Sequence, residues 1–175
     1  MRRLLSLITV TFFLSACLPA SQKVTIGSGS GTPAQRVEKI TMLMPTSKKL
    51  SDPVHGEEVG LAYGALDGAN GTVANGVVTA HYFQDGSTVI GLQLNIAVAK
   101  DGTFYNAWLE NDAGSTIINM GELQSSVADV RHSAHFESKD NLQNLHKVIV
   151  TLQKTGAAHA PAAVVATGTL KTTSR

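Results

Sequence analysis

Alternation between apolar and polar residues is the dominant pattern along this chain. It is clearest over residues 90–98, where Ile90, Leu92, Leu94, Ile96 and Val98 alternate with small or polar residues. A period of two buries one face of a β-strand and leaves the other in water. Comparable runs predict about nine strands, at residues 40–44, 59–66, 72–83, 90–98, 104–110, 116–123, 130–136, 147–152 and 164–170.

Asp-Gly and Asn-Gly dipeptides accompany these runs, and they favour the positive φ angles that close tight β-hairpins. They occur at residues 67–68, 70–71, 75–76, 85–86 and 101–102. Dense turns between short strands predict an all-β fold, an antiparallel β-sandwich of about 8–9 strands with a β-barrel as the alternative. A short helix is expected, if anywhere, at 48–58, which contains Pro53, or at 139–145.

The N-terminus has a different pattern. Arg2 and Arg3 precede an apolar run over residues 4–13, and small residues follow before Cys17. This order is typical of a secretory signal. The apolar run is about ten residues long, whereas a transmembrane helix needs roughly 20. The sequence therefore favours a cleaved signal peptide over a permanent membrane span.

The last four residues of this region, Leu14-Ser15-Ala16-Cys17, resemble the lipobox of bacterial lipoproteins. The resemblance implies cleavage between Ala16 and Cys17, a diacylglycerol thioether on Cys17 and a fatty acid such as palmitate on the new amine. Two or three chains anchor stably, since each buried methylene contributes about 0.8 kcal/mol. We expect a lipid anchor in the cell membrane or outer membrane, facing outside the cytoplasm. A signal peptide with an unmodified Cys17 is the alternative.

Residues 17–36 are rich in Ser, Gly, Thr and Pro and show no sustained apolar period. Such a composition predicts a flexible linker, and about 20 residues of it extend roughly 25 Å on average. The predicted organisation is a signal peptide at 1–16, the lipidated Cys17 and linker at 17–36, and one β-domain at 37–175. Cys17 is the only cysteine, so the domain has no disulfide and its core alone must hold it together.

The net charge of the chain is +1, and it becomes −1 when Arg2 and Arg3 leave with the signal. Binding to nucleic acid calls for a basic patch or stripe. A nucleic-acid partner is therefore not expected.

A distinctive motif surrounds the single tryptophan, in Tyr105-Asn106-Ala107-Trp108-Leu109. Tyr105 and Trp108 are three residues apart, so on a regular strand they face opposite sides. One ring is then expected in the core. The other ring either packs as well or contributes to a possible binding surface.

Together with the segments at 120–123, 148–153 and 167–170 and with Pro161, this motif resembles the extracytoplasmic C-terminal β-domain of anti-sigma-K-type factors. A group of uncharacterised lipoproteins carries a similar domain. The resemblance covers roughly residues 57–171. It implies a β-domain outside the cytoplasm and supplies no catalytic residues. Because the sigma-binding region and membrane helix of those factors have no counterpart here, the chain is not expected to hold a sigma factor by itself.

Six histidines raise the question of a metal site. His132 and His135 are three apart on a predicted strand and would face opposite sides, which argues against a shared ion. His132 lies on the same face as Val130 and Phe136, so a partly buried, hydrogen-bonded histidine is expected. The remaining histidines, His55, His81, His146 and His159, are scattered, and we expect no metal and no cofactor.

Catalytic patterns are equally sparse. The sequence contains no Gly-x-Ser-x-Gly elbow, and Glu57 and Glu58 read as a solvated loop pair. Oxygen-bearing turn residues can collect calcium, but the twelve-residue calcium loop is missing and turn formation is the ordinary role of such residues. The turn residues concerned are Asp101, Asn111, Asp112, Asp140 and Asn141.

These patterns favour a lipid-anchored envelope protein whose β-domain binds or senses an envelope partner without catalysis. Two alternatives stay open. One is an envelope hydrolase or metal-dependent enzyme whose site is assembled by the fold, which convergence of histidines and carboxylates in a cleft would favour. The other is a regulatory partner of a separate anti-sigma system.

Overall fold

The computed structural model describes residues 48–125, 129–157 and 160–173. The predicted signal peptide, Cys17, the linker and the predicted strand at 40–44 lie outside the described residues. Every regular element in the described part of the chain is a β-strand. No helix there has the length and apolar character that a membrane crossing requires.

The chain forms its strands close to where alternation predicts them. Eight of the predicted runs coincide with β2 to β6 and β8 to β10, and the two-residue strands β1 and β7 and the short β11 add to them. The bounds are β1 Ser51–Asp52, β2 Gly56–Gly68, β3 Ala74–Phe83, β4 Thr88–Ile96, β5 Thr103–Glu110, β6 Ile117–Glu122, β7 Gln124–Ser125, β8 Arg131–Ser138, β9 Lys147–Lys154, β10 Ala163–Thr169 and β11 Lys171–Thr173.

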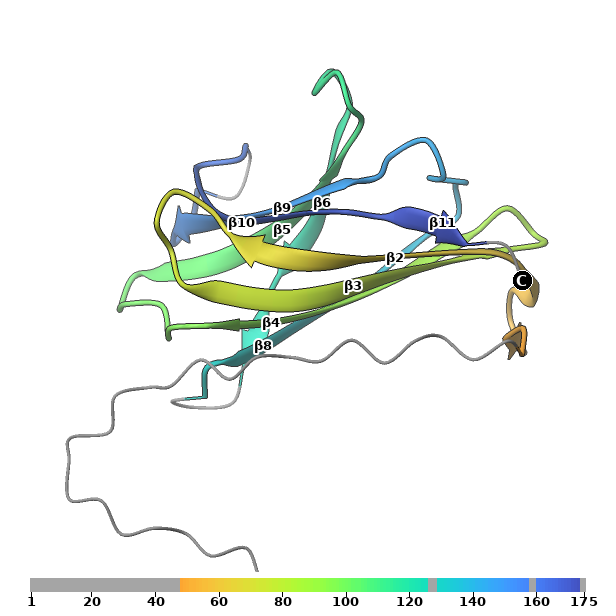
Figure 1. Ribbon diagram of the computed structural model, residues 1–175, viewed down its shortest axis with the longest axis horizontal. Helices are drawn as coiled ribbons and strands as arrows, with labels where there is room; N and C mark the ends of the chain where they lie inside the picture. Colours follow the sequence, from red (N-terminus) through yellow and green to blue (C-terminus); the bar gives the residue numbers. More distant parts are fainter. Residues whose placement is uncertain (1–47, 126–128, 158–159, 174–175) are drawn as a thin grey trace, which may run out of the picture. The chain divides into compact units, whose positions relative to one another are not determined.

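All strands belong to one antiparallel sheet, with the order β6-β5-β9-β10-β2-β3-β4-β8-β7 and with β1 and β11 paired to β2. Only Leu123 separates β6 from β7, and these two strands pair with β5 and with β8 respectively. The sheet therefore nearly closes into a barrel. In the view of Figure 1, the strands β5, β6, β9 and β10 are drawn above the strands β2, β3, β4 and β8. The all-β prediction is confirmed, and its barrel alternative describes the closure.

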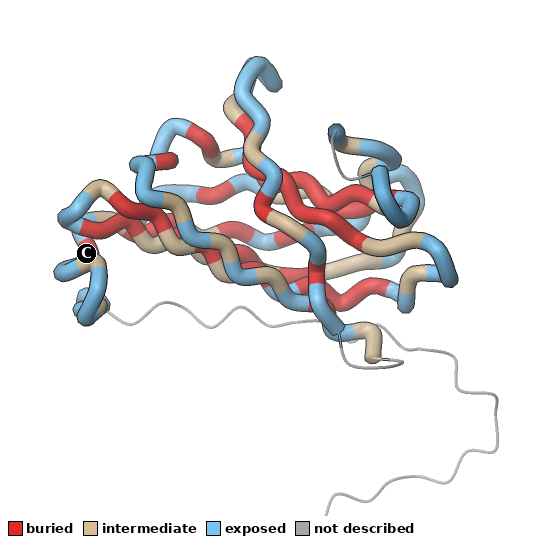
Figure 2. The backbone as a smooth tube through the Cα atoms, turned by 180° about the vertical axis from the view of Figure 1, so that it is seen from behind, coloured by how far each residue is buried: buried red, intermediate tan, exposed pale blue. Residues whose placement is uncertain are grey.

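Alternation determines the core. Inward residues of β3, β4, β5 and β9, such as Val78, Leu94, Leu109 and Val150, are fully buried and pack in one cluster. Figure 2 shows the buried positions gathered along the strands and the exposed positions at the loops. Most of the outward side chains of β3, β4 and β8, on the opposite face of the sheet, are partly or fully exposed.

Three of the five predicted Gly turns connect strands. Asn70 and Gly71 both have positive φ between β2 and β3, and Gly86 and Gly102 have positive φ in the turns before β4 and β5. The dipeptides at 67–68 and 75–76 instead pair with each other inside β2 and β3. A Cβ on Gly76 would lie 2.3 Å from the Gln93 carbonyl oxygen, so close approach of two backbones explains this glycine.

Neither candidate helix forms. Residues 48–58 turn sharply after Pro53, because the Asp52 carboxylate accepts hydrogen bonds from the Val54 and His55 amides. Such a side-chain turn competes with helical hydrogen bonding. Residues 139–145 likewise form turns, and the Asn141 side chain accepts from the Gln143 amide.

Candidate functional site

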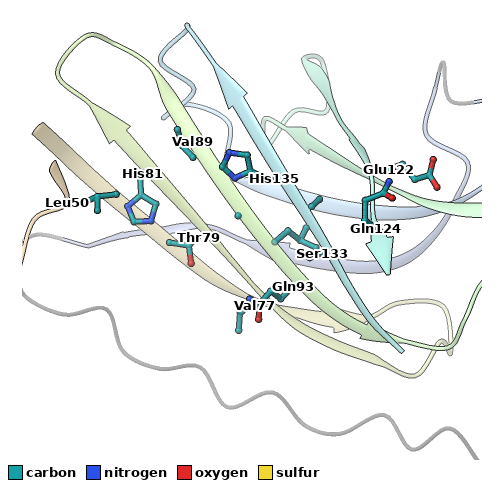
Figure 3. A pocket seen from close by; sticks show the side chains of 13 residues that line it. Leu50, Val77, Thr79, His81, Val89, Gln93, Glu122, Gln124, Ser133 and His135 are labelled. Atoms are coloured by element: carbon teal, nitrogen blue, oxygen red, sulfur yellow. The ribbon is translucent and has the colours of Figure 1, made fainter. Parts of the chain in front are cut away.

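The outer face of β3, β4 and β8 forms a groove with a volume of about 760 Å³. This size falls within the range of roughly 300–1,000 Å³ that is typical of small-ligand sites. Figure 3 shows side chains of the three strands along it, with β6 and β7 at its border. The groove is lined by Leu50, Val77, Thr79, His81, Val89, Gly91, Leu92, Gln93, Glu122, Gln124, Ser133, Ala134 and His135.

Gly91 occupies the centre of this groove. The sheet register places it between Thr79 of β3 and His135 of β8. A Cβ on Gly91 would meet no described atom within 4 Å, and Gly91 is not among the glycines with positive φ. Neither backbone conformation nor packing in the described structure demands a glycine here. Its effect is an open depression in the middle of the face.

Neutral hydrogen-bonding groups surround the depression. Gln93 follows Gly91 on the same face of β4, and it lies opposite Val77 of β3 and Ser133 of β8. Gln124 of β7 pairs with Ser133 and extends the polar border. The groove thus offers amides and hydroxyls with aliphatic groups between them.

A buried carboxylate supports one end of the groove. Glu58 is 1% exposed, and its Oε2 accepts a 2.8 Å hydrogen bond from the Leu50 amide. The same oxygen lies 3.6 Å from Nδ1 of His81, whose side chain is about one-quarter exposed. This separation is too long for a hydrogen bond. The Glu58 carboxyl nevertheless lies close to His81, which lines the groove.

A second histidine lies close to this end. The centroid of the His55 ring lies 5.4 Å from that of the Phe83 ring, and the centroid of the His81 ring lies 6.5 Å from that of the Phe83 ring. His55 Nδ1 lies 3.0 Å from Asp85, and its Nε2 lies 3.2 Å from Glu137. His55, Asp85 and Glu137, which we call the His55 clamp, connect the turn before β2, the turn between β3 and β4, and β8.

Electrostatics favour the charged form of the His55 clamp. The hydrogen bond with Asp85 raises the pKa of His55, and the charges of Asp85, Glu137 and Asp52 add to the effect. Hydrogen bonds from the Ser87 hydroxyl and from His55 lower the pKa of Asp85 to about 2. The imidazolium and the carboxylate therefore stabilise each other in mildly acidic solution.

The His55 clamp is not arranged like a metal site. Its two carboxylates bind opposite nitrogens of one ring and do not face a common point. In the described residues no group of three or more His, Cys, Asp or Glu side chains could hold a metal ion.

The tryptophan motif packs on both faces of β5, as the spacing predicts. Tyr105 is 7% exposed and belongs to the main core, where its hydroxyl donates to the Ala97 carbonyl. Trp108 is 3% exposed on the opposite face, and its indole N–H donates a 2.8 Å hydrogen bond to Thr151 Oγ1. Neither ring is exposed, so packing describes both of them better than a possible binding surface does.

The predictions for His132 and His135 are confirmed. His132 is 5% exposed, hydrogen-bonds the Val130 carbonyl through Nδ1 and meets the Tyr105 ring edge-on. His135 is exposed on the other face and lines the groove.

The remaining candidates are dispersed. His146 pairs with Asp112 at 2.7 Å, and His159 lies outside the described residues, as do Ala16 and Cys17. Asn111 and Asn141 act as turn formers, since their side chains accept from nearby backbone amides. Glu58, read from the sequence as part of a solvated loop pair, is instead buried.

Sequence reasoning missed the groove itself. One signal was present: Gly91 interrupts the outward face of the clearest alternating run. A glycine inside a strand often marks a place where a ligand or another backbone approaches. The partners that complete the groove come from other strands, and their register is not visible in the sequence.

No protein-family model, no curated protein and no solved structure matches this chain. The resemblance to the outer domain of anti-sigma-K-type factors therefore stays a prediction. So do the lipidation of Cys17, the location in the envelope and the expectation of a non-catalytic role.

Proposed function

We propose that this chain is a lipid-anchored protein of the bacterial envelope and that its barrel binds an envelope component in the groove of β3, β4 and β8. The observation that carries the binding role is the depression at Gly91, which lies at the centre of a groove of about 760 Å³ lined by both aliphatic and polar side chains. The anchoring role is supported by the signal pattern and by the Leu14–Cys17 motif.

The groove has the composition of a recognition site. Polar groups at defined positions confer specificity, and aliphatic groups between them contribute contact area. The polar groups at its centre come from paired strands, which hold functional side chains more precisely than loops do. The buried Glu58 carboxyl lies 3.6 Å from His81, a lining residue of the groove.

Anchoring is tested with Cys17→Ala. Without the thiol no lipid can be attached, and we expect the chain to leave the membrane fraction or to remain as an uncleaved, slower-migrating precursor. Fractionation and electrophoresis measure both outcomes, and Ser15→Ala serves as the control. If Cys17→Ala changes neither the location nor the mass, the chain is not a lipoprotein.

Binding is tested with Gly91→Gln, which places a side chain in the depression. The full chain, extracted in mild detergent, is mixed with detergent-insoluble envelope fragments and sedimented. We expect the wild-type chain and the control Ala163→Gln, an exposed change on β10, to sediment with the fragments and Gly91→Gln to stay in solution. Equal sedimentation of all three, or of none, would contradict a binding role for the groove.

A further inference from the structure

The chemistry of the groove also indicates what kind of molecule it binds, an inference that rests on the proposed function. We infer that the ligand is a neutral glycan segment, one of whose sugar rings occupies the depression at Gly91. The inference depends on three features of the face, namely its charge, its mixture of polar and aliphatic groups, and the pairing of its strands.

The charges of the lining residues favour a neutral ligand over an anionic one. None of the described residues that line the groove is Lys or Arg, and the only carboxylate in the lining, Glu122, is at its border. Nucleic acid and other phosphate-rich ligands are bound through cationic side chains. Among the described lining residues a polyanion would find no Lys or Arg, and only the histidines His81 and His135 could become cationic.

Polarity separates a glycan from an acyl chain. The side chains of Thr79, Gln93, Gln124 and Ser133 supply hydroxyl and amide groups along the face. An acyl chain would remove these groups from water without giving them hydrogen bonds, at a cost in free energy. Sugar hydroxyls can pair with them, and the C–H faces of a sugar ring can pack on aliphatic neighbours such as Val89.

Strand pairing separates a glycan from an extended peptide. Peptides that bind to sheets commonly add a strand at an open edge, through backbone hydrogen bonds. β4 is paired on both sides, to β3 and to β8, along the length of the groove. At Gly91, in the centre of the groove, no backbone ladder is therefore open, and recognition there must come from side chains.

The residues around Gly91 define which groups a sugar ring in the depression would meet. Thr79 and His135 flank it, and Val89 and Gln93 precede and follow it on the same face of β4. A ring that enters the depression reaches hydroxyl, amide and imidazole groups around its edge. Any side chain at position 91 would fill the space that the ring needs.

The test uses the full chain in mild detergent and an array of neutral and anionic glycans, followed by titration calorimetry with the best neutral oligosaccharide. We expect neutral glycans to bind, Gly91→Gln to weaken the affinity by about tenfold or more, and Ala163→Gln to leave it within about twofold. Gln93→Ala, which removes an amide without filling the depression, should also weaken binding. Melting temperature and circular dichroism show whether each variant is folded, and Gly91→Gln should be at least as stable as wild type because glycine is unfavourable within a strand.

The outcomes separate this inference from the proposed function. If no neutral glycan binds, or anionic glycans bind better, the assignment of the ligand is wrong even when sedimentation with envelope fragments still depends on position 91. If neutral glycans bind equally to wild type and to folded Gly91→Gln, the groove is not their site. Neutral glycan binding that is lost in folded Gly91→Gln supports the inference.

Discussion

The hydrogen bond between Trp108 and Thr151 allows a quantitative test of how the outer face of β5 and β9 is held. Thr151 is fully buried, and its hydroxyl accepts from the Trp108 indole at 2.8 Å and from the Gln153 amide at 3.1 Å. Thr151→Val replaces the hydroxyl with a methyl group of similar size. The indole N–H is then left buried without this acceptor, and the Gln153 amide loses its bond to residue 151 but keeps its bond to the Ala160 carbonyl.

A buried donor that loses its acceptor costs about 1–3 kcal/mol. We therefore expect Thr151→Val to lower the free energy of unfolding by about 2 kcal/mol and the melting temperature by roughly 6–10 °C. Urea unfolding followed by fluorescence measures the change, because Trp108 is the only tryptophan. Thr79→Val, a change on the partly exposed groove face, is the control and should stay within about 0.5 kcal/mol of wild type.

A double-mutant cycle decides whether the hydrogen bond causes the loss. In a Trp108→Phe background the indole donor is missing, so adding Thr151→Val should cost clearly less than in the wild type. The remaining cost comes from the hydrogen bonds that Thr151 makes with the Gln153 amide and the Asn106 carbonyl. Circular dichroism replaces fluorescence in that background. An equal cost in both backgrounds would refute the reasoning, because the loss would then come from packing around residue 151 and not from the orphaned N–H.

Two further predictions concern the His55 clamp and a close backbone contact. His55→Gln should lower the melting temperature most between about pH 4 and 6.5. Because the pKa of His55 is raised, its contribution to stability is full below pH 6.5 and is lost as the pH rises through the raised value, whereas the contribution of Asp85, whose pKa is lowered to about 2, is lost as the pH falls below 3.8. A difference in melting temperature from wild type that is the same at pH 5.5 and pH 9 would contradict this. Gly64→Ala would place a Cβ 2.2 Å from the Thr169 carbonyl oxygen, so thermal melting should show a loss of about 3 kcal/mol or more, whereas Ala65→Ser at the exposed neighbour should have little effect.

Much of the fold follows from the order of residues alone. The alternation of Ile90, Leu92 and Leu94 predicts both a strand and its buried face, and Asn70-Gly71 predicts the hairpin between β2 and β3. Because His132 and His135 are three residues apart on one strand, the sequence also predicts that they lie on opposite faces. These features are local, because a period of two and a positive φ depend on residues next to each other in the chain.

Local signals were misleading where distant backbone decided the outcome. The dipeptides at 67–68 and 75–76 have the same composition as turn formers, yet they pair within β2 and β3. Their glycines allow other strands to approach closely, as the 2.3 Å separation at Gly76 shows. Close approach depends on the register between paired strands, which the sequence of a dipeptide does not determine.

The candidate site shows the same division. The sequence by itself determined the alternating strands, the signal pattern that ends at Cys17, the turn at Asn70-Gly71 and the opposite faces of Tyr105 and Trp108. The tertiary structure alone decided that Gly91 lies between Thr79 and His135, that His55 meets both Asp85 and Glu137, and that β6 and β7 nearly close the sheet. The reason is physical: periodicity tells each strand which face to bury, whereas a groove is made by side chains that only pairing between distant strands brings together.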